Sequence, residues 1–404
     1  MGLDIKIRAF YALVKAGLWE TKVRLEQYGT IDFKEVYRLA DEQSVIGLVT
    51  AGIEQVEDIK VPQVDALIFV GSALLLEQRN LSMNVFIAGM LPQTAKAGIN
   101  CVLVKGQGIG QCYMRPNWRS AGDIDLLVNE SSYINARAFF DKLTEQSIPE
   151  RKDSSRKHLE YTIGTWLVEL HGTMRTNLSK KIDSVIDKAQ NRVFDEGEVR
   201  GWENGNIKVI LPSPDNDVIF IFTHILQHFF RGGIGLRQLC DLARLLWTHR
   251  NSINRPLLKQ RLEKMGVMTE WKAFGYILVE VLGLQKEAMP FYDNGYKNKA
   301  ARVLSLIMES GNFGHNNDYS YFTKYPTIIR KVITVWKQTL SSFRLASIFP
   351  LDSFRFYFSF LLNKAKSDED LQVDVETKLT EEGYKVEEGK ITIGSTEINI
   401  AEEI

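Results

Sequence analysis

The sequence predicts an α+β fold, a small mixed β-sheet flanked by larger helical regions. Apolar residues recur at three- and four-residue spacing over much of the chain, the periodicity of amphipathic helices. Short apolar runs with β-branched residues, typical of buried strands, interrupt this pattern between residues 100 and 211. The chain has 404 residues, 45% apolar and 25% charged, an ordinary globular composition long enough for two or three structural units.

The first 98 residues predict an N-terminal helical region. Apolar residues keep helical spacing over residues 5–26, 33–56 and 64–97. Gly29-Thr30 and Val61-Pro62 separate these segments, because glycine and proline interrupt helices.

The sheet is predicted in a central core over residues 99–211. Asn129 to Ser132 offer caps for an amphipathic helix over residues 133–146, and Gly164-Thr165 favours a hairpin turn. The expected strands cover residues 100–104, 123–128, 161–163, 166–171 and 208–211.

A C-terminal helical region is predicted over residues 212–365. Pro212-Ser213-Pro214 marks its start, and helical patterns follow over residues 218–229 and 236–249. Beyond it, residues 366–404 form an acidic tail that could fold as a small β-meander or be disordered, and the sequence favours neither. The meander strands would cover residues 384–386, 390–393 and 397–400.

The charge distribution and the cysteine content indicate which partners and which compartment to expect. The tail carries 12 acids and 4 bases, a net charge of −8, so the other 365 residues, with 38 acids and 46 bases, carry +8. That mild excess suits anionic small molecules such as nucleotides and makes nucleic acid an unlikely partner. Cys101, Cys112 and Cys240 form no CxxC pair, which favours a reducing compartment. With no apolar run able to span a bilayer and no secretory signal, we expect a cytoplasmic protein without a membrane partner.

Paired carboxylates are the strongest chemical signal. Asp123 and Asp125 lie two residues apart in a predicted strand, so both side chains point to one face, about 7 Å apart. Carboxylates that converge repel each other unless a cation lies between them, and Mg²⁺ prefers such oxygen ligands. The alternative is a strand whose acids simply face water.

The surroundings favour the metal site. Lys105 and Gly106 follow a buried strand, where backbone N–H groups and a cation can approach a phosphate, and Arg119 adds positive charge. Glu169 lies between apolar neighbours on a later strand, so it faces the opposite side from them. If that side is the cleft, three acids converge.

These motifs resemble the polymerase-β-like nucleotidyltransferase superfamily. More narrowly, the chain resembles a large, mostly uncharacterised bacterial nucleotidyltransferase family with a Lys-Gly signature, over roughly residues 35–250. The matching residues are Lys105-Gly106, Tyr113, Pro116, Arg119, the Gly-Asp-Ile-Asp-Leu-Leu-Val run at 122–128, Glu169-Leu170-His171, His228, and the helix that contains Asp241-Leu242-Ala243. Gln107 departs from the superfamily, which prefers Ser or Gly there, and this weakens the case for phosphate binding through that position.

The resemblance implies transfer of a nucleoside monophosphate from a nucleoside triphosphate to an unknown acceptor, a small molecule or a protein. Asp123, Asp125 and Glu169 would hold two Mg²⁺ or Mn²⁺ ions and act catalytically. The phosphate-binding residues would be Lys105, Gly106, Gln107 and Arg119, and substrate contacts would involve His171 and His228.

Other interpretations remain open from the sequence. The protein could bind nucleotide with weak or no catalysis, or nucleotidylate another protein as in toxin–antitoxin systems. His224 and His228, four residues apart, could be a zinc pair but are more simply hydrogen-bonded, partly buried histidines. The glycines at 106, 108 and 110 fit neither a dinucleotide-binding motif nor a P-loop.

Overall fold

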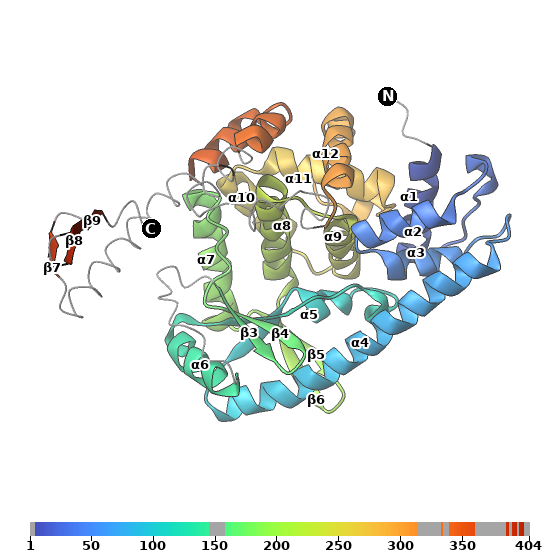
Figure 1. The fold of residues 1–404 in the computed structure, drawn as a ribbon. Helices are drawn as coiled ribbons and strands as arrows, with labels where there is room; N and C mark the ends of the chain where they lie inside the picture. The colour runs from blue at the N-terminus through green and yellow to red at the C-terminus, as the bar shows by residue number, and fades with distance from the viewer. Residues whose placement is uncertain are drawn as a thin grey trace. The chain divides into compact units, whose positions relative to one another are not determined.

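The structure is a computed structural model, and the fold is α+β, as predicted (Figure 1). It describes residues 5–144, 158–312, 333 and 339–359, and the strand residues 385–387, 390–393 and 396–399. The described residues within 1–176 and 181–316 belong to one compact unit. Those within 177–180 and 317–404 belong to a second. The predicted site residues all lie in the larger unit.

The N-terminal part consists of four helices, and the predicted segment 33–56 is two of them. Ser44, with a φ of 54°, lies between α2 and α3 and breaks the helical path. Gly52 lets α3 pack closely on α1, since a Cβ there would lie 2.1 Å from the Leu13 carbonyl oxygen. The helices are α1 (Ile5–Trp19), α2 (Phe33–Glu42), α3 (Ile46–Ile53) and the long α4 (Gln63–Lys96).

A four-stranded mixed sheet follows, with strand order β1-β2-β4-β3. β1 (Cys101–Val104) pairs antiparallel with β2 (Ile124–Val128), and β2 pairs parallel with β4 (Trp166–His171). β3 (His158–Ile163) completes the predicted hairpin with β4. The strands predicted over residues 100–104, 123–128 and 161–163 are therefore present with shifted ends, and the strand over residues 166–171 has the predicted ends.

One face of this sheet is covered by α4 and by α6 (Glu130–Leu143). Leu126 and Leu170 from the two central strands share a buried core with Ile87 of α4 and Phe140 of α6. Because side chains alternate along a strand, the neighbours of these leucines face the other side.

Two elements in the stretch between the sheet and residue 208 were not predicted. α7 (Lys180–Phe194) buries an apolar stripe that includes Ile182, Val185 and Ala189. β5 (Val199–Asn204) pairs with β6 (Ile207–Pro212) as a separate hairpin, and β6 packs beside β1.

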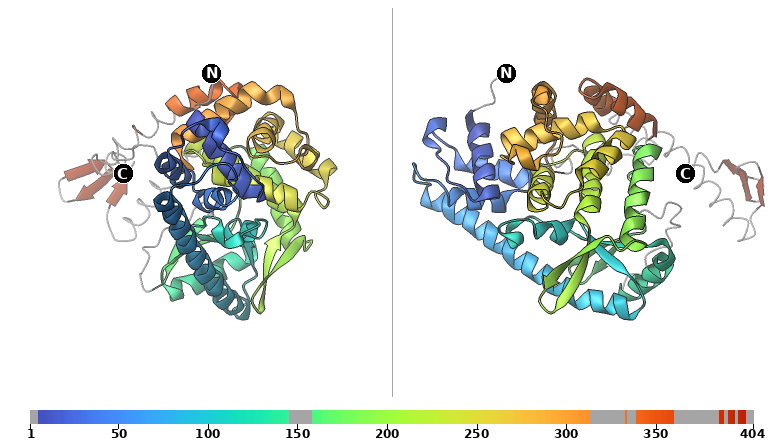
Figure 2. Two further views of the ribbon diagram at one scale, coloured as in Figure 1. Left: turned by 90° about the vertical axis from the view of Figure 1, so that its right-hand side faces the viewer. Right: turned by 180° about the vertical axis from the view of Figure 1, so that it is seen from behind.

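The remaining helices of the larger unit include the strongly apolar α8, which begins after Ser213 with Pro214 at its first turn. They are α8 (Pro214–Arg231), α9 (Leu236–Thr248), α10 (Arg255–Met265), α11 (Met268–Tyr276) and α12 (Lys297–Ser310). A short helix, α5 (Gly106–Gly110), follows β1. Figures 1 and 2 show that α8 and α9 lie next to the sheet and that α4 runs along an outer edge of this unit.

In the smaller unit, β7 (Lys385–Glu387), β8 (Lys390–Ile393) and β9 (Thr396–Asn399) form an antiparallel meander. Residues 339–346 and 350–359 are helical. The predicted division of the chain into four regions, with boundaries after residues 98, 211 and 365, stays a prediction. Among the described residues, no helix is both long and apolar enough to cross a membrane.

Candidate active site

Asp125 and Glu169 lie side by side on the two central strands of the sheet. The parallel register pairs Asp125 of β2 directly with Glu169 of β4. Their neighbours, Ile124 and Leu126 on β2 and Val168 on β4, are buried in the core on the opposite face. The alternation of each strand therefore directs both acids away from the core and toward α8.

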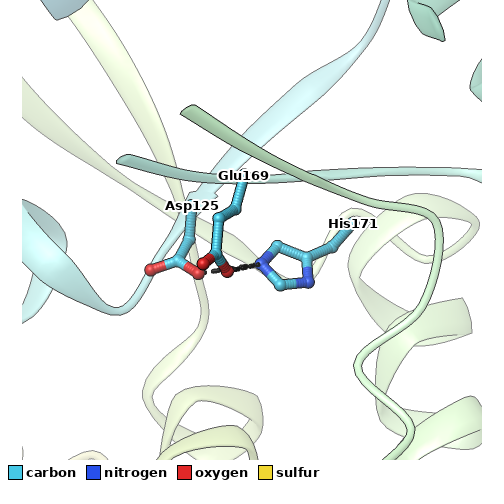
Figure 3. Close-up of side chains that lie close together, drawn as sticks. All are labelled: Asp125, Glu169 and His171. Carbon is cyan, nitrogen blue, oxygen red and sulfur yellow. Dashed lines mark hydrogen bonds and ion pairs between the residues drawn. The ribbon is translucent and has the colours of Figure 1, made fainter. Parts of the chain in front are cut away.

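Two cationic groups surround the carboxylate of Asp125. The Lys105 Nζ donates a hydrogen bond to Oδ1 over 2.9 Å, and His171 Nε2 lies 2.8 Å from the same oxygen. His171 Nε2 also lies 3.3 Å from Oε2 of Glu169. Figure 3 shows the imidazole pointing toward both carboxylates. We call Lys105, Asp125, Glu169 and His171 the acid cluster.

Electrostatics within the acid cluster favour charged forms despite burial. Burial raises the pKa of Asp125, but Lys105 and His171 outweigh it and hold that pKa well below its usual range. Burial and the Lys105 charge lower the pKa of His171, but its hydrogen bonds to Asp125 and Glu169 raise it above its ordinary value. Lys105, and His171 when it is protonated, thus place positive charge against these two acids.

Asp123 immediately precedes β2 and faces the same cavity, with no cation as close as those on Asp125. Burial raises the pKa of Asp123 to about 6, and the charges of Asp125 and Glu169 add to the effect. Burial is thus the main cause of the raised pKa, and the charges of Lys105 and Arg237 offset it only in part.

Arg119, which was predicted to bind phosphate, instead forms an ion pair with Asp241. Its Nε and Nη2 donate to Oδ1 and Oδ2 of Asp241 over 2.7 and 2.8 Å, and the Tyr113 hydroxyl donates to Oδ1 over 2.7 Å. Both charged side chains are nearly fully buried. We call Tyr113, Arg119 and Asp241 the arginine cluster. Its bidentate geometry uses the part of the guanidinium that would otherwise grip a phosphate.

Gln107 does not face the cavity. Its side chain is buried in α5, where Nε2 donates to Oδ1 of Asn80 over 2.9 Å and lies 3.2 Å from the Met83 sulfur. Asn80 in turn donates to the carbonyls of Asn117 and Arg119 over 2.7 and 2.8 Å. Gln107 thus helps to fix the loop that carries Arg119.

One cavity of about 570 Å³ brings together every predicted site residue except Gln107. This volume is typical of small-molecule sites. The acids and Lys105 form one side of it. The other side comes from the loop at residues 173–176 and from helices α8 and α9. The α8 and α9 lining residues are Phe220, Ile221, His224, Ile225, Gln227, His228, Arg231, Arg237, Gln238 and Asp241.

Two neutral histidines line the α8 side of the cavity. The His224 and His228 rings meet edge to face with centroids 4.4 Å apart. Burial lowers the pKa of His228 to about 4, helped by the charge of Lys105, and lowers that of His224 well below its ordinary value. Both rings are therefore neutral near pH 7.

The sequence reasoning missed several cavity residues, among them Arg231, Arg237 and the loop from Thr173 to Thr176. A signal for the α8 residues does exist. Ile221, His224, Ile225 and His228 recur at three- and four-residue spacing and so share one helix face. The loop residues carry no such pattern.

Asp125, Glu169 and His171 form a group that could hold a metal ion. One ligand atom from each lies within 4.8 Å of the other two. The two carboxylates are the oxygen ligands that Mg²⁺ and Mn²⁺ prefer, whereas an imidazole is more usual at Zn²⁺ or iron. The predicted ligand set had Asp123 in place of His171.

The comparison with protein families gives the class of protein. A model of a family described as uncharacterised nucleotidyltransferases matches residues 29–283, more than half of the chain. No curated protein and no solved structure matches. The matched segment contains the four-stranded sheet, the acid cluster, the arginine cluster and the whole cavity lining. The chain belongs to this nucleotidyltransferase family.

Proposed function

We propose that the protein transfers a nucleoside monophosphate from a nucleoside triphosphate to an acceptor, with the acid cluster and Asp123 as its catalytic centre. One observation carries the proposal. Asp125 and Glu169 lie opposite each other on two parallel strands, and both line the cavity. Membership of a nucleotidyltransferase family supports the reaction class.

Divalent metal would be held by Asp125 and Glu169, with Asp123 and His171 within reach of the same space. The donor set fits, because the structure satisfies these acids with Lys105 and His171, positive groups at the position a metal cation would take. Bound Mg²⁺ or Mn²⁺ would supply charge neutralisation at the phosphates and lower the pKa of the acceptor hydroxyl.

In the reaction, the acceptor oxygen bonds to the α-phosphorus, the bond to the bridging oxygen breaks, and pyrophosphate leaves with that oxygen. Lys105 is placed to pair with the phosphates once its ammonium leaves Asp125. Glu169 is partly exposed to the cavity and could take the acceptor proton. Arg119 holds the site in shape through Asp241, and we assign it no direct phosphate contact.

The α8 side of the cavity would receive the acceptor or the base. Phe220, Ile221 and Ile225 supply apolar surface, while neutral His224 and His228 supply hydrogen-bonding nitrogens. Arg231 and Arg237 place positive charge at the same side. Such a lining suits an anionic or aromatic group.

The test is a screen of four nucleoside triphosphates with Mg²⁺ or Mn²⁺, measuring pyrophosphate and any self-labelling by mass spectrometry. We expect metal-dependent turnover with one or more of them. Asp125→Asn should lower turnover by at least about 10³-fold, an effect of the size seen when a group of the catalytic device is removed. The matched control is Glu203→Gln on the β5–β6 hairpin, where an exposed acid lies outside the cavity.

Full activity in Asp125→Asn would place the chemistry elsewhere. A second candidate, nucleotide binding without turnover, is favoured by the position of Gln107. Its side chain points into the protein rather than to the phosphates. Metal-dependent nucleotide binding without pyrophosphate release would favour that candidate. Labelling of the protein itself would favour a protein acceptor.

A further inference from the structure

Helix α4 carries a long apolar strip that faces away from the rest of its unit. One side of the helix packs inward through Phe69, Ala73, Met83 and Ile87. The opposite side leaves large apolar side chains exposed, from Val70 at 40% to Val85 at 73%. We call this set the α4 strip: Val64, Leu67, Ile68, Val70, Leu74, Leu75, Leu81 and Val85. Figures 1 and 2 both show α4 along an outer edge of the larger unit.

The exposed apolar area of the α4 strip is larger than a monomeric protein usually leaves in contact with water. The α4 strip extends over 22 residues, from Val64 to Val85, or about 30 Å of helix. Its exposed side chains offer on the order of 700 Å², close to one partner's share of a standard protein interface and above the largest patch of a typical monomer. Among the exposed residues of α4 from 64 to 89, Arg79 is the one charged side chain.

Two glycines on the same side point to close approach by another backbone. Gly71 and Gly89 lie within the helix and are exposed, and a Cβ at either would meet nothing within 4 Å. A glycine inside a helix costs about 1 kcal/mol relative to alanine. Neither glycine has a positive φ or a close neighbour that requires it.

We propose that the α4 strip is the interface of a two-fold symmetric dimer, in which α4 pairs antiparallel with α4 of a second copy. A two-fold interface must be self-complementary, because the same surface meets itself. The α4 strip has this property about the midpoint between Leu74 and Leu75. Val64 mirrors Val85, Ile68 mirrors Leu81, and Leu74 mirrors Leu75.

The mirrored positions also match in size and charge. Leu67 lies opposite Ser82, and Gly71 lies opposite Gln78, so a large side chain meets a small residue in each pair. Arg79 lies opposite Val70, which keeps the two copies of Arg79 about 13 Å apart along the helix. The pairing therefore brings no like charges together.

The first experiment is sedimentation of the full chain at micromolar concentrations. We expect twice the chain mass of 46.1 kDa. Leu75→Glu would place a carboxylate against Leu74 of the other copy at both sides of the axis, and should weaken association at least about 100-fold. Folding should be unaffected, since Leu75 is exposed within one chain and glutamate favours helices.

The matched control is Ile134→Glu on α6, where an equally exposed apolar residue lies outside the α4 strip. It should dimerise like the parent. A monomer at every concentration would overturn the proposal, and so would a dimer that Leu75→Glu leaves intact.

Cysteine pairs test the antiparallel register. In a Cys101→Ser background, a mixture of Val64→Cys and Val85→Cys chains should form a disulfide between copies on oxidation. Val64→Cys alone should not, because its two copies would be about 30 Å apart. Cross-linking of Val64→Cys with itself, at the yield of the mixture, would rule out the antiparallel pairing.

Discussion

The acid cluster and the arginine cluster are both buried groups of charge on the wall of one cavity, yet they are built differently. In the arginine cluster, both oxygens of Asp241 are held by Arg119, and Tyr113 adds a further hydrogen bond. In the acid cluster, Lys105 and His171 share a single oxygen of Asp125. Asp123 stands nearby with a raised pKa. The arginine cluster, in which every charge is paired, is suited to hold structure. The acid cluster, with Asp123 as a further acid beside it, is suited to bind a cation.

The largest stability effect is expected in the arginine cluster. Asp241→Asn would leave the Arg119 guanidinium buried without its counter-ion, which should lower the free energy of unfolding by about 3–5 kcal/mol. The matched control is Asp187→Asn, whose partner Arg175 makes the same bidentate contact at the surface. That change should cost at most about 1 kcal/mol. Urea denaturation of both variants measures the difference, and equal losses would remove the distinction between buried and exposed pairs.

A smaller loss is expected from Asp125→Asn in the absence of metal, about 2–3 kcal/mol at pH 7. The neutral amide would no longer pair with Lys105 and His171, although the imidazole can release its proton. Because the folded pKa of Asp125 is depressed, its contribution exists above the unfolded pKa and is lost as the pH falls. Because this loss begins only below the ordinary aspartate pKa of about 3.9, thermal melts at pH 7 and at about pH 2 measure it, and a stabilised variant at pH 7 would contradict it.

Asp123→Asn should act in the opposite direction. The folded pKa of about 6 lies above that of an unfolded aspartate, so the charged form destabilises the metal-free protein above pH 6. The variant should be more stable than the parent by about 1–3 kcal/mol at pH 8. The gain should shrink between pH 6 and pH 4. A gain that does not depend on pH would mean that repulsion among the acids is not its cause.

The smallest effect is expected on nucleotide affinity when the acidic tail is removed, because no tail residue is part of the acid cluster or the arginine cluster. A chain ending at residue 367 should bind nucleotide triphosphate with unchanged or slightly higher affinity, because the lost residues carry net negative charge that repels the ligand. Calorimetric titration at low and moderate salt measures this. A loss of tenfold or more would assign the tail a part in the site.

Local patterns predicted the sheet that carries the acids. The alternation around Asp125 and Glu169 fixed the face of each side chain before any pairing was known, and β4 has the predicted bounds. α7 was missed although its apolar residues have helical spacing and Gly197 follows its end by three residues. The break between α2 and α3 depends on the backbone of Ser44, which composition does not reveal.

The contacts of the arginine cluster could not be predicted from the sequence. Arg119 and Asp241 are 122 residues apart, and their pairing depends on how α9 packs beside the loop that follows α5. A free Arg119 beside a phosphate was therefore a reasonable prediction from the chain alone. The contact of Lys105 with Asp125, 20 residues away, was not predicted either, because it is set by the register between β1 and β2.

The position of β2 has a consequence for the timing of hydrogen exchange. β2 is hydrogen-bonded to β1 on one side and β4 on the other, and all five of its residues are buried. Its amide protons should exchange with deuterated solvent only when the whole unit opens, so they should be among the last to be replaced. The backbone beneath Asp125 would then stay fixed on the timescale of minutes to hours, while ligands enter and leave above it.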